Sequence, residues 1–144
     1  MKNELSVFVP SHITGFFEII QNSNPLLKGS KGAGITLDEG VVTNTKIKDG
    51  NGNIIINVNN KEDSLNTISK KTVKIILDRY NVNIQDYDIY INHDSKLPIG
   101  AGFGTSAAFA LGISFTLPKL MGINISFKEA GEIAHLAEIS QSSG

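Results

Sequence analysis

The sequence predicts an α+β fold, and two observations support this. Runs rich in β-branched and aromatic residues dominate the first part of the chain, whereas most helix-type patterns follow later. The chain has 144 residues, 40% of them apolar, which suffices for one domain with its own core. It contains no repeat, low-complexity tract or linker, so we expect one domain over residues 1–144.

The first strand is expected at Leu5–Pro10, a β-branched and aromatic run that ends at proline. This strand delivers the segment Ser11–Glu18 to its carboxyl end. Three glycines in Lys28–Gly34 favour a turn in which the backbone approaches another group closely. The turn leads into a strand near Ile35–Leu37.

A β-hairpin is expected next, formed by the β-rich runs Gly40–Lys48 and Asn53–Asn59. The residues between them, Asp49–Gly52, favour the positive φ values of tight turns. An amphipathic helix then begins near the candidate N-caps Asp63 and Ser64, because apolar residues recur at close to helical spacing up to Tyr80.

A strand at Tyr87–His93 is predicted from strict alternation of its apolar residues. It runs into the stretch Leu97–Leu111, in which three glycines and two hydroxyl residues precede an alanine-rich run. We expect a buried helix at about Thr105–Lys119, with Pro118 bending or ending its last turn and Gly122 marking the stop.

The last predicted helix covers Phe127–Ser140 and is preceded by a capping box, Ser126–Glu129. Its packed side is expected to carry Ala130, Ile133, Ala134 and Ala137. The chain ends in a small polar cluster typical of the entry to another loop. We therefore expect the chain to be the N-terminal part of a longer one.

The composition argues against several classes of protein, among them nucleic-acid-binding, membrane and disulfide-rich proteins. A formal net charge of -1 and a pI near 6.3 give no electrostatic reason to bind nucleic acid or an anionic membrane. Cysteine is absent, which excludes disulfides and thiolate chemistry. No apolar run approaches the roughly 20 residues of a membrane span, and the charged N-terminus does not resemble a signal peptide. A cytoplasmic location is the expectation.

The glycine-rich stretch has the composition of a phosphate cradle. Backbone N–H groups at a helix start attract anions, and glycine lets a phosphate approach closely. It is not a Walker A motif, because the Gly-Lys-Ser/Thr element is missing, and it lacks the GxGxxG spacing of a dinucleotide fold. From residue types alone, a tight helix entry that uses glycine for packing explains the stretch equally well.

The neighbouring residues make the pattern more specific. The run from Pro98 to Ala108, P-I-G-A-G-F-G-T-S-A-A, resembles the phosphate-loop motif of the GHMP kinases, written P-x-x-x-G-L-G-S-S-A-A. Phe103 and Thr105 are mild departures from it. Residues 9–18, V-P-S-H-I-T-G-F-F-E, look like the first motif of the family, which carries Lys or Arg in most members where His12 stands. With residues 29–34, G-S-K-G-A-G, they are most similar to one branch, the archaeal pantoate kinases.

The resemblance implies a GHMP kinase N-terminal domain, of the kind called ribosomal protein S5 domain 2-like, with a mixed sheet and helices packed on it. It implies ATP and Mg²⁺ as cofactors, with Ser106 and Glu138 as Mg²⁺ ligands and pantoate as the small-molecule substrate. The product would be 4-phosphopantoate, for coenzyme A biosynthesis. The predicted ATP-binding residues are Pro98, Gly100, Gly102, Phe103, Gly104, Thr105, Ser106 and Ala107.

On the substrate side, the resemblance singles out His12 and Ser30. His12 would hold a carboxylate or orient the attacking hydroxyl. Asn22, Ser23 and Asn24 are weaker candidates for the border of the pantoate pocket, and His93 and His135 receive no role. The catalytic aspartate of the family is expected beyond Gly144, as is the C-terminal domain. We therefore expect the 144-residue chain alone to bind ATP weakly and not to phosphorylate pantoate.

Alternatives remain. The chain could act on homoserine, shikimate or mevalonate, as other GHMP kinases do, or be a non-catalytic nucleotide-binding module. An S5-like domain that binds RNA is a further alternative, which the near-neutral charge disfavours. A homodimer is left open.

Overall fold

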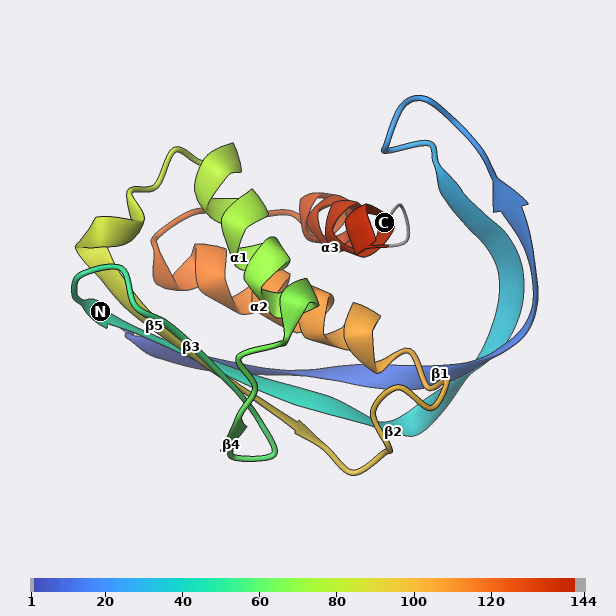
Figure 1. The fold of residues 1–144 in the computed structure, drawn as a ribbon, viewed down its shortest axis with the longest axis horizontal. Coiled ribbons are helices and arrows are strands. Elements are labelled where there is room, and N and C mark those ends of the chain that lie inside the picture. The colour runs from blue at the N-terminus through green and yellow to red at the C-terminus, as the bar shows by residue number, and fades with distance from the viewer. Residues whose placement is uncertain (1, 142–144) are drawn as a thin grey trace.

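The computed structural model describes residues 2–141, which form a five-stranded sheet with helices on one face (Figure 1). This arrangement confirms the predicted α+β class. A short 3-10 helix, η1, covers Ile84–Asp86. No helix within residues 2–141 is long and apolar enough to cross a membrane. The strands are β1 (Glu4–Ile20), β2 (Gly29–Asp49), β3 (Ile54–Val58), β4 (Lys61–Glu62) and β5 (Tyr87–Ser95); the helices are α1 (Thr67–Arg79), α2 (Thr105–Leu120) and α3 (Phe127–Gln141).

The sheet is mixed, as predicted, with the strand order β1-β2-β5-β3-β4. β5 is antiparallel to β2 and parallel to β3. The predicted hairpin of β2 and β3 is therefore wrong, because β5 lies between these two strands. The turn at Asp49–Gly52 instead wraps the start of β5, where the Asp88 carboxylate accepts hydrogen bonds from the amides of Asn51 and Asn53 at 3.0 and 2.9 Å. These bonds hold the pKa of Asp88 below its usual value.

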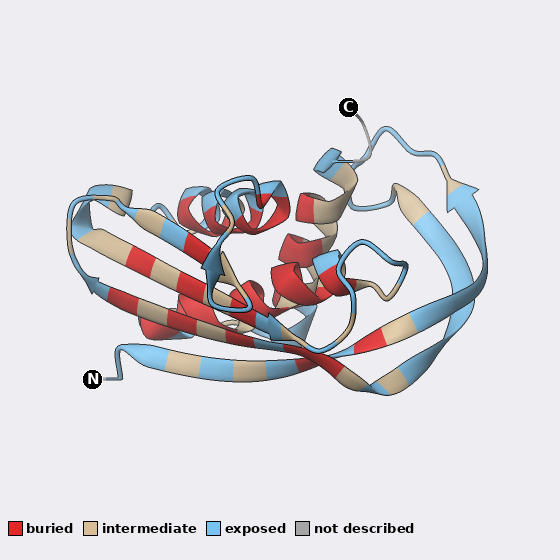
Figure 2. Ribbon diagram, turned by 60° about the horizontal axis from the view of Figure 1, so that its bottom comes forward, coloured by how far each residue is buried: buried red, intermediate tan, exposed pale blue. Residues whose placement is uncertain are grey.

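β1 and β2 are much longer than the sequence predicts. Ser11–Glu18 continues β1 instead of following it. Most of the predicted turn at Lys28–Gly34 is strand, because β2 begins at Gly29. Glycine explains the second error, because it also permits close strand pairing: a Cβ on Gly32 would lie 2.1 Å from the Phe16 carbonyl oxygen. The outer ends of the two strands form a curved, exposed ribbon that leaves the sheet (Figures 1 and 2).

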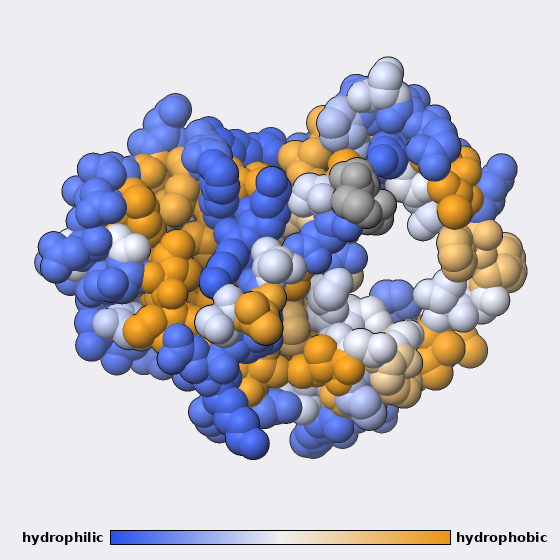
Figure 3. Space-filling model, in the orientation of Figure 1, coloured by the Kyte–Doolittle hydropathy of each residue, from blue (hydrophilic) through white to orange (hydrophobic). Residues whose placement is uncertain are grey.

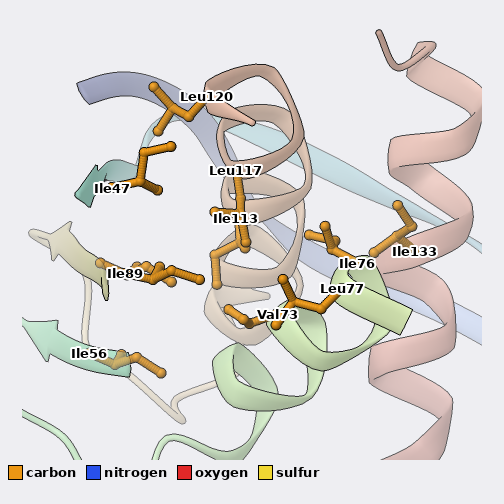
Figure 4. Close-up of a cluster of buried hydrophobic side chains, with 11 residues drawn as sticks. Ile47, Ile56, Val73, Ile76, Leu77, Ile89, Ile113, Leu117, Leu120 and Ile133 are labelled. Carbon is orange, nitrogen blue, oxygen red and sulfur yellow. The ribbon is translucent and has the colours of Figure 1, made fainter. Parts of the chain in front are cut away.

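The core lies between the sheet and the helices (Figure 4). α2 contributes Ile113 and Leu117, both fully buried, and ends at Leu120 with Pro118 in its last turn. α3 buries the predicted side, and its capping box is confirmed: the Ser126 amide donates to the Glu129 carboxylate at 2.9 Å, and the Glu129 amide donates to Ser126 Oγ at 3.2 Å. Each fully buried aliphatic side chain contributes about 1.5–3 kcal/mol to stability.

α1 begins later than predicted. Asn66 caps this helix, and its Oδ1 accepts from the Ser69 amide at 3.0 Å. Asp63 instead caps a local turn by accepting from the Leu65 amide at 3.3 Å. Both Asp and Asn cap turns as well as helices, so composition alone does not separate the two.

A buried histidine joins the sheet to two helices. The ring of His93 on β5 lies between Thr43 of β2 and Ser69 of α1, whose hydroxyls are each 2.9 Å from one ring nitrogen. The ring also stacks on Phe109 of α2 at a centroid distance of 4.1 Å. Burial lowers the pKa of His93 to about 3, so the imidazole is neutral near pH 7.

Candidate phosphate-binding and acceptor site

The loop between β5 and α2 exposes backbone at a helix start. Gly100, Gly102 and Gly104 have φ angles of 76°, 87° and 68°, a left-handed conformation that residues with a Cβ rarely adopt. Gly104 is the N-cap of α2 and supplies no side-chain cap. The first amides of α2 are therefore available to an external anion, which the helix dipole also favours.

Open space in front of the loop fits a phosphate chain. A Cβ built on Gly100 or Gly102 would meet nothing within 4 Å, and both residues are exposed, as is Pro98. At Gly104 the reason for glycine is different, because a Cβ there would lie 2.2 Å from Cε1 of His12. Thr105 is buried at 4% exposure, whereas Ser106 beside it is exposed.

The two predicted Mg²⁺ ligands lie in contact. Ser106 in the first turn of α2 donates its hydroxyl to the Glu138 carboxylate near the end of α3, with an Oγ–Oε1 distance of 2.5 Å. Hydroxyl and carboxylate oxygens suit Mg²⁺, which usually takes its other ligands from phosphate and water. Residues 2–141 contain no group of three or more His, Cys, Asp or Glu that could hold a metal without such help.

A cavity of about 490 Å³ lies between the ribbon and α3. Figure 3 shows the opening between these two parts of the molecule. Ser30, a predicted substrate-binding residue, lines this cavity together with Glu138, a predicted metal ligand. The volume falls within the range of small-molecule sites. The structure thus brings a predicted substrate residue and a predicted metal ligand to one cavity, whereas none of the predicted ATP-binding residues lines it.

His12 lies elsewhere in the site. Its backbone amide donates to the carbonyl of Phe103 at 3.2 Å, and its ring packs against Gly104. It does not line the cavity that Ser30 and Glu138 share. His12 therefore holds β1 against the glycine loop, on the phosphate side of the site.

Sequence reasoning gave no role to two ionisable residues of the cavity, Lys28 and His135. His135 Nε2 donates to the Pro25 carbonyl at 3.1 Å, which ties α3 to the tip of the ribbon. One signal for His135 was present: it precedes Glu138 by three residues, so the two share a face of any helix. Lys28 had no such signal, because its place depends on the curvature of the ribbon.

Comparison with known proteins gives a family match. The family model described as the GHMP kinases N terminal domain matches residues 66–144. The match includes the glycine loop, Ser106 and Glu138, and it ends at the last residue of the chain. It covers more than half of the sequence.

Among curated proteins, the chain is 39% identical to the pantoate kinase of Methanocaldococcus jannaschii over 138 residues, which are 96% of this chain and 47% of that protein. It is 30% identical to the pantoate kinase of Methanospirillum hungatei, over 97% of this chain and 47% of the relative. The chain thus spans about half the length of these relatives.

A solved structure titled "Phosphotransferase related to CoA biosynthesis pathway" superposes on 98% of this chain and 47% of its own, with a TM-score of 0.82 and 27% identity. The agreement extends over nearly the whole chain, so it covers the ribbon as well as the core. The predicted fold type is confirmed.

Proposed function

This chain belongs to the GHMP kinase family, whose N-terminal domain it matches, and from this membership we propose that it forms the ATP-binding part of a pantoate kinase. The reaction transfers the γ-phosphoryl group of ATP to the 4-hydroxyl of pantoate. One observation carries the proposal: the Ser106–Glu138 pair adjoins the cavity that Ser30 lines. The relatives named pantoate kinase support the choice of acceptor.

Each part of the site has a role in this proposal. The loop and the first turn of α2, from Pro98 to Ala107, enclose the triphosphate, and the residues after Pro98, which itself has no N–H, donate to it through backbone amides. Ser106 and Glu138 hold Mg²⁺, which neutralises phosphate charge when it is bound. Ser30 contacts the acceptor in the cavity. His12 holds β1 against the glycine loop, on the phosphate side of the site. Such catalysis depends mainly on positioning and charge neutralisation.

An acceptor panel tests the proposal. The protein that carries this chain is assayed for ADP release with pantoate, homoserine, shikimate and mevalonate, and the products are identified by mass spectrometry. We expect kcat/KM for pantoate to exceed the others by roughly tenfold or more, and activity to require Mg²⁺. A higher value for another acid would replace pantoate as the substrate. Absence of ADP release with every acceptor would refute kinase activity.

A further inference from the structure

Lys28 occupies a defined position at the tip of the ribbon, in the connection between β1 and β2. It directly precedes β2, and its backbone amide donates to the Asn24 carbonyl at 3.1 Å. The residue is half-buried. It lines the cavity of Ser30 and Glu138 and also a neighbouring cavity of about 470 Å³. The Lys28 side chain therefore stands where two cavities adjoin.

The charge of Lys28 has no ion-pair partner in the part of the chain that the structure describes. Among the described residues that line the first cavity, Glu138 carries the one carboxylate, and it already accepts the Ser106 hydroxyl. An anionic ligand in the cavity would give the Lys28 ammonium a charge-assisted hydrogen bond, which is stronger than one between neutral groups.

The rest of the cavity shows which kind of anion fits. Ile19, Ile20 and Ile139 supply apolar wall, and Ser30 supplies a hydroxyl. Glu138 marks the position of the proposed metal. A ligand that matches these groups has a hydroxyl, a short apolar body and a carboxylate.

We propose that Lys28 binds the carboxylate of the acceptor and thereby selects hydroxy acids over neutral alcohols. This inference rests on the proposed kinase function. The acceptor lies with its reacting hydroxyl toward Glu138 and its carboxylate toward Lys28. Lys28 is a specificity-determining residue and takes no part in the transfer itself.

The test compares Lys28→Met with Lys28→Arg in the protein that carries this chain, using pantoate and its neutral amide as acceptors. Loss of one charge-assisted hydrogen bond should raise the KM for pantoate about 10- to 100-fold in Lys28→Met. The KM for ATP should stay within about twofold, and Lys28→Arg should restore most of the affinity. The amide should be used equally by the unmodified protein and by Lys28→Met.

Lys71→Met is the matched control, because Lys71 lines only the neighbouring cavity of the two. It should leave the KM for pantoate unchanged. An unchanged KM for pantoate in Lys28→Met would overturn the role of Lys28 while the kinase function stands. Equal losses with pantoate and the amide would overturn it too, since they indicate a structural effect. If the unmodified protein phosphorylates no acceptor, the function proposal fails and this one fails with it.

Discussion

Ser106 and Glu138 are 32 residues apart in the chain, yet their side chains share a hydrogen bond. The first turn of α2 and the last turns of α3 meet there, because the two helices pack against each other. This packing keeps the Ser106 hydroxyl and the Glu138 carboxylate together beside the glycine loop. At the residue scale, the packing of α2 against α3 therefore brings the two side chains together.

Replacement of either residue should impair catalysis more than folding. We expect Ser106→Ala and Glu138→Gln each to lower kcat by about a hundredfold or more at saturating ATP and Mg²⁺, because each removes one of the two side chains proposed to hold the Mg²⁺ that neutralises phosphate charge. Steady-state ADP release measures this.

Glu132→Gln is the matched control on the same helix, since Glu132 pairs with Arg79 at 3.1 Å outside the site. This variant should change kcat less than twofold. Near-normal turnover in Ser106→Ala or Glu138→Gln would remove that residue from the metal site.

At the scale of elements, α2 lies close to the sheet at Gly112. A Cβ on Gly112 would lie 2.2 Å from the hydroxyl oxygen of Thr43 on β2. Glycine in a helix interior costs about 1 kcal/mol relative to alanine, so propensity alone would favour alanine here. The close approach of helix and strand requires the glycine.

Gly112→Ala should therefore destabilise the protein by about 1–3 kcal/mol, as overpacking of a core usually does. Gly131 on α3 is the control, because a Cβ there would meet nothing within 4 Å. Gly131→Ala should stabilise by about 0.5–1 kcal/mol. Urea unfolding measures both, and a stabilising Gly112→Ala would contradict the packing argument.

The helices and β5 could be predicted because their signals are local. Apolar spacing, the capping box at Ser126 and the alternation in Tyr87–His93 each depend on neighbours in sequence. The strand order could not be predicted, because a turn such as Asp49–Gly52 has the same composition whether its strands pair directly or enclose a third. The same holds for the candidate site. Ser106 and Glu138 could be proposed from sequence motifs, whereas the position of Lys28 in the cavity depends on the tertiary structure.

At the scale of the whole molecule, His93 links stability to pH. Its ring joins β5, β2, α1 and α2 through two hydrogen bonds and a stacking contact. Its pKa is about 3 in the folded state, against 6.5 as the ordinary value. The unfolded chain therefore takes up a proton below pH 6.5 that the folded protein does not accept until about pH 3. The stability that the neutral His93 contributes to the folded protein is fully present above pH 6.5 and is lost as the pH falls toward 3.

We expect the free energy of unfolding to fall by up to about 1.4 kcal/mol per pH unit below pH 6.5 on account of His93. Urea unfolding at pH 7, 6 and 5 measures this slope. His93→Gln should be less stable at pH 7 but should show a shallower slope. The pKa values of Asp88 and Glu129 are lowered from 3.8 and 4.5, so these two carboxylates add to the loss of stability only at lower pH, where they become protonated. Equal slopes in both proteins would contradict the assignment to His93.

The insertion of β5 between β2 and β3 also constrains the order of folding. β2 ends at Asp49 and β3 at Val58, but neither finds its central neighbour until residues 87–95 are in place. Loop-closure entropy must be overcome before these pairings form, which makes such topologies slow to fold. During synthesis, the edges of β2 and β3 that pair with β5 have no partner until residues 87–95 emerge and join the two halves of the sheet.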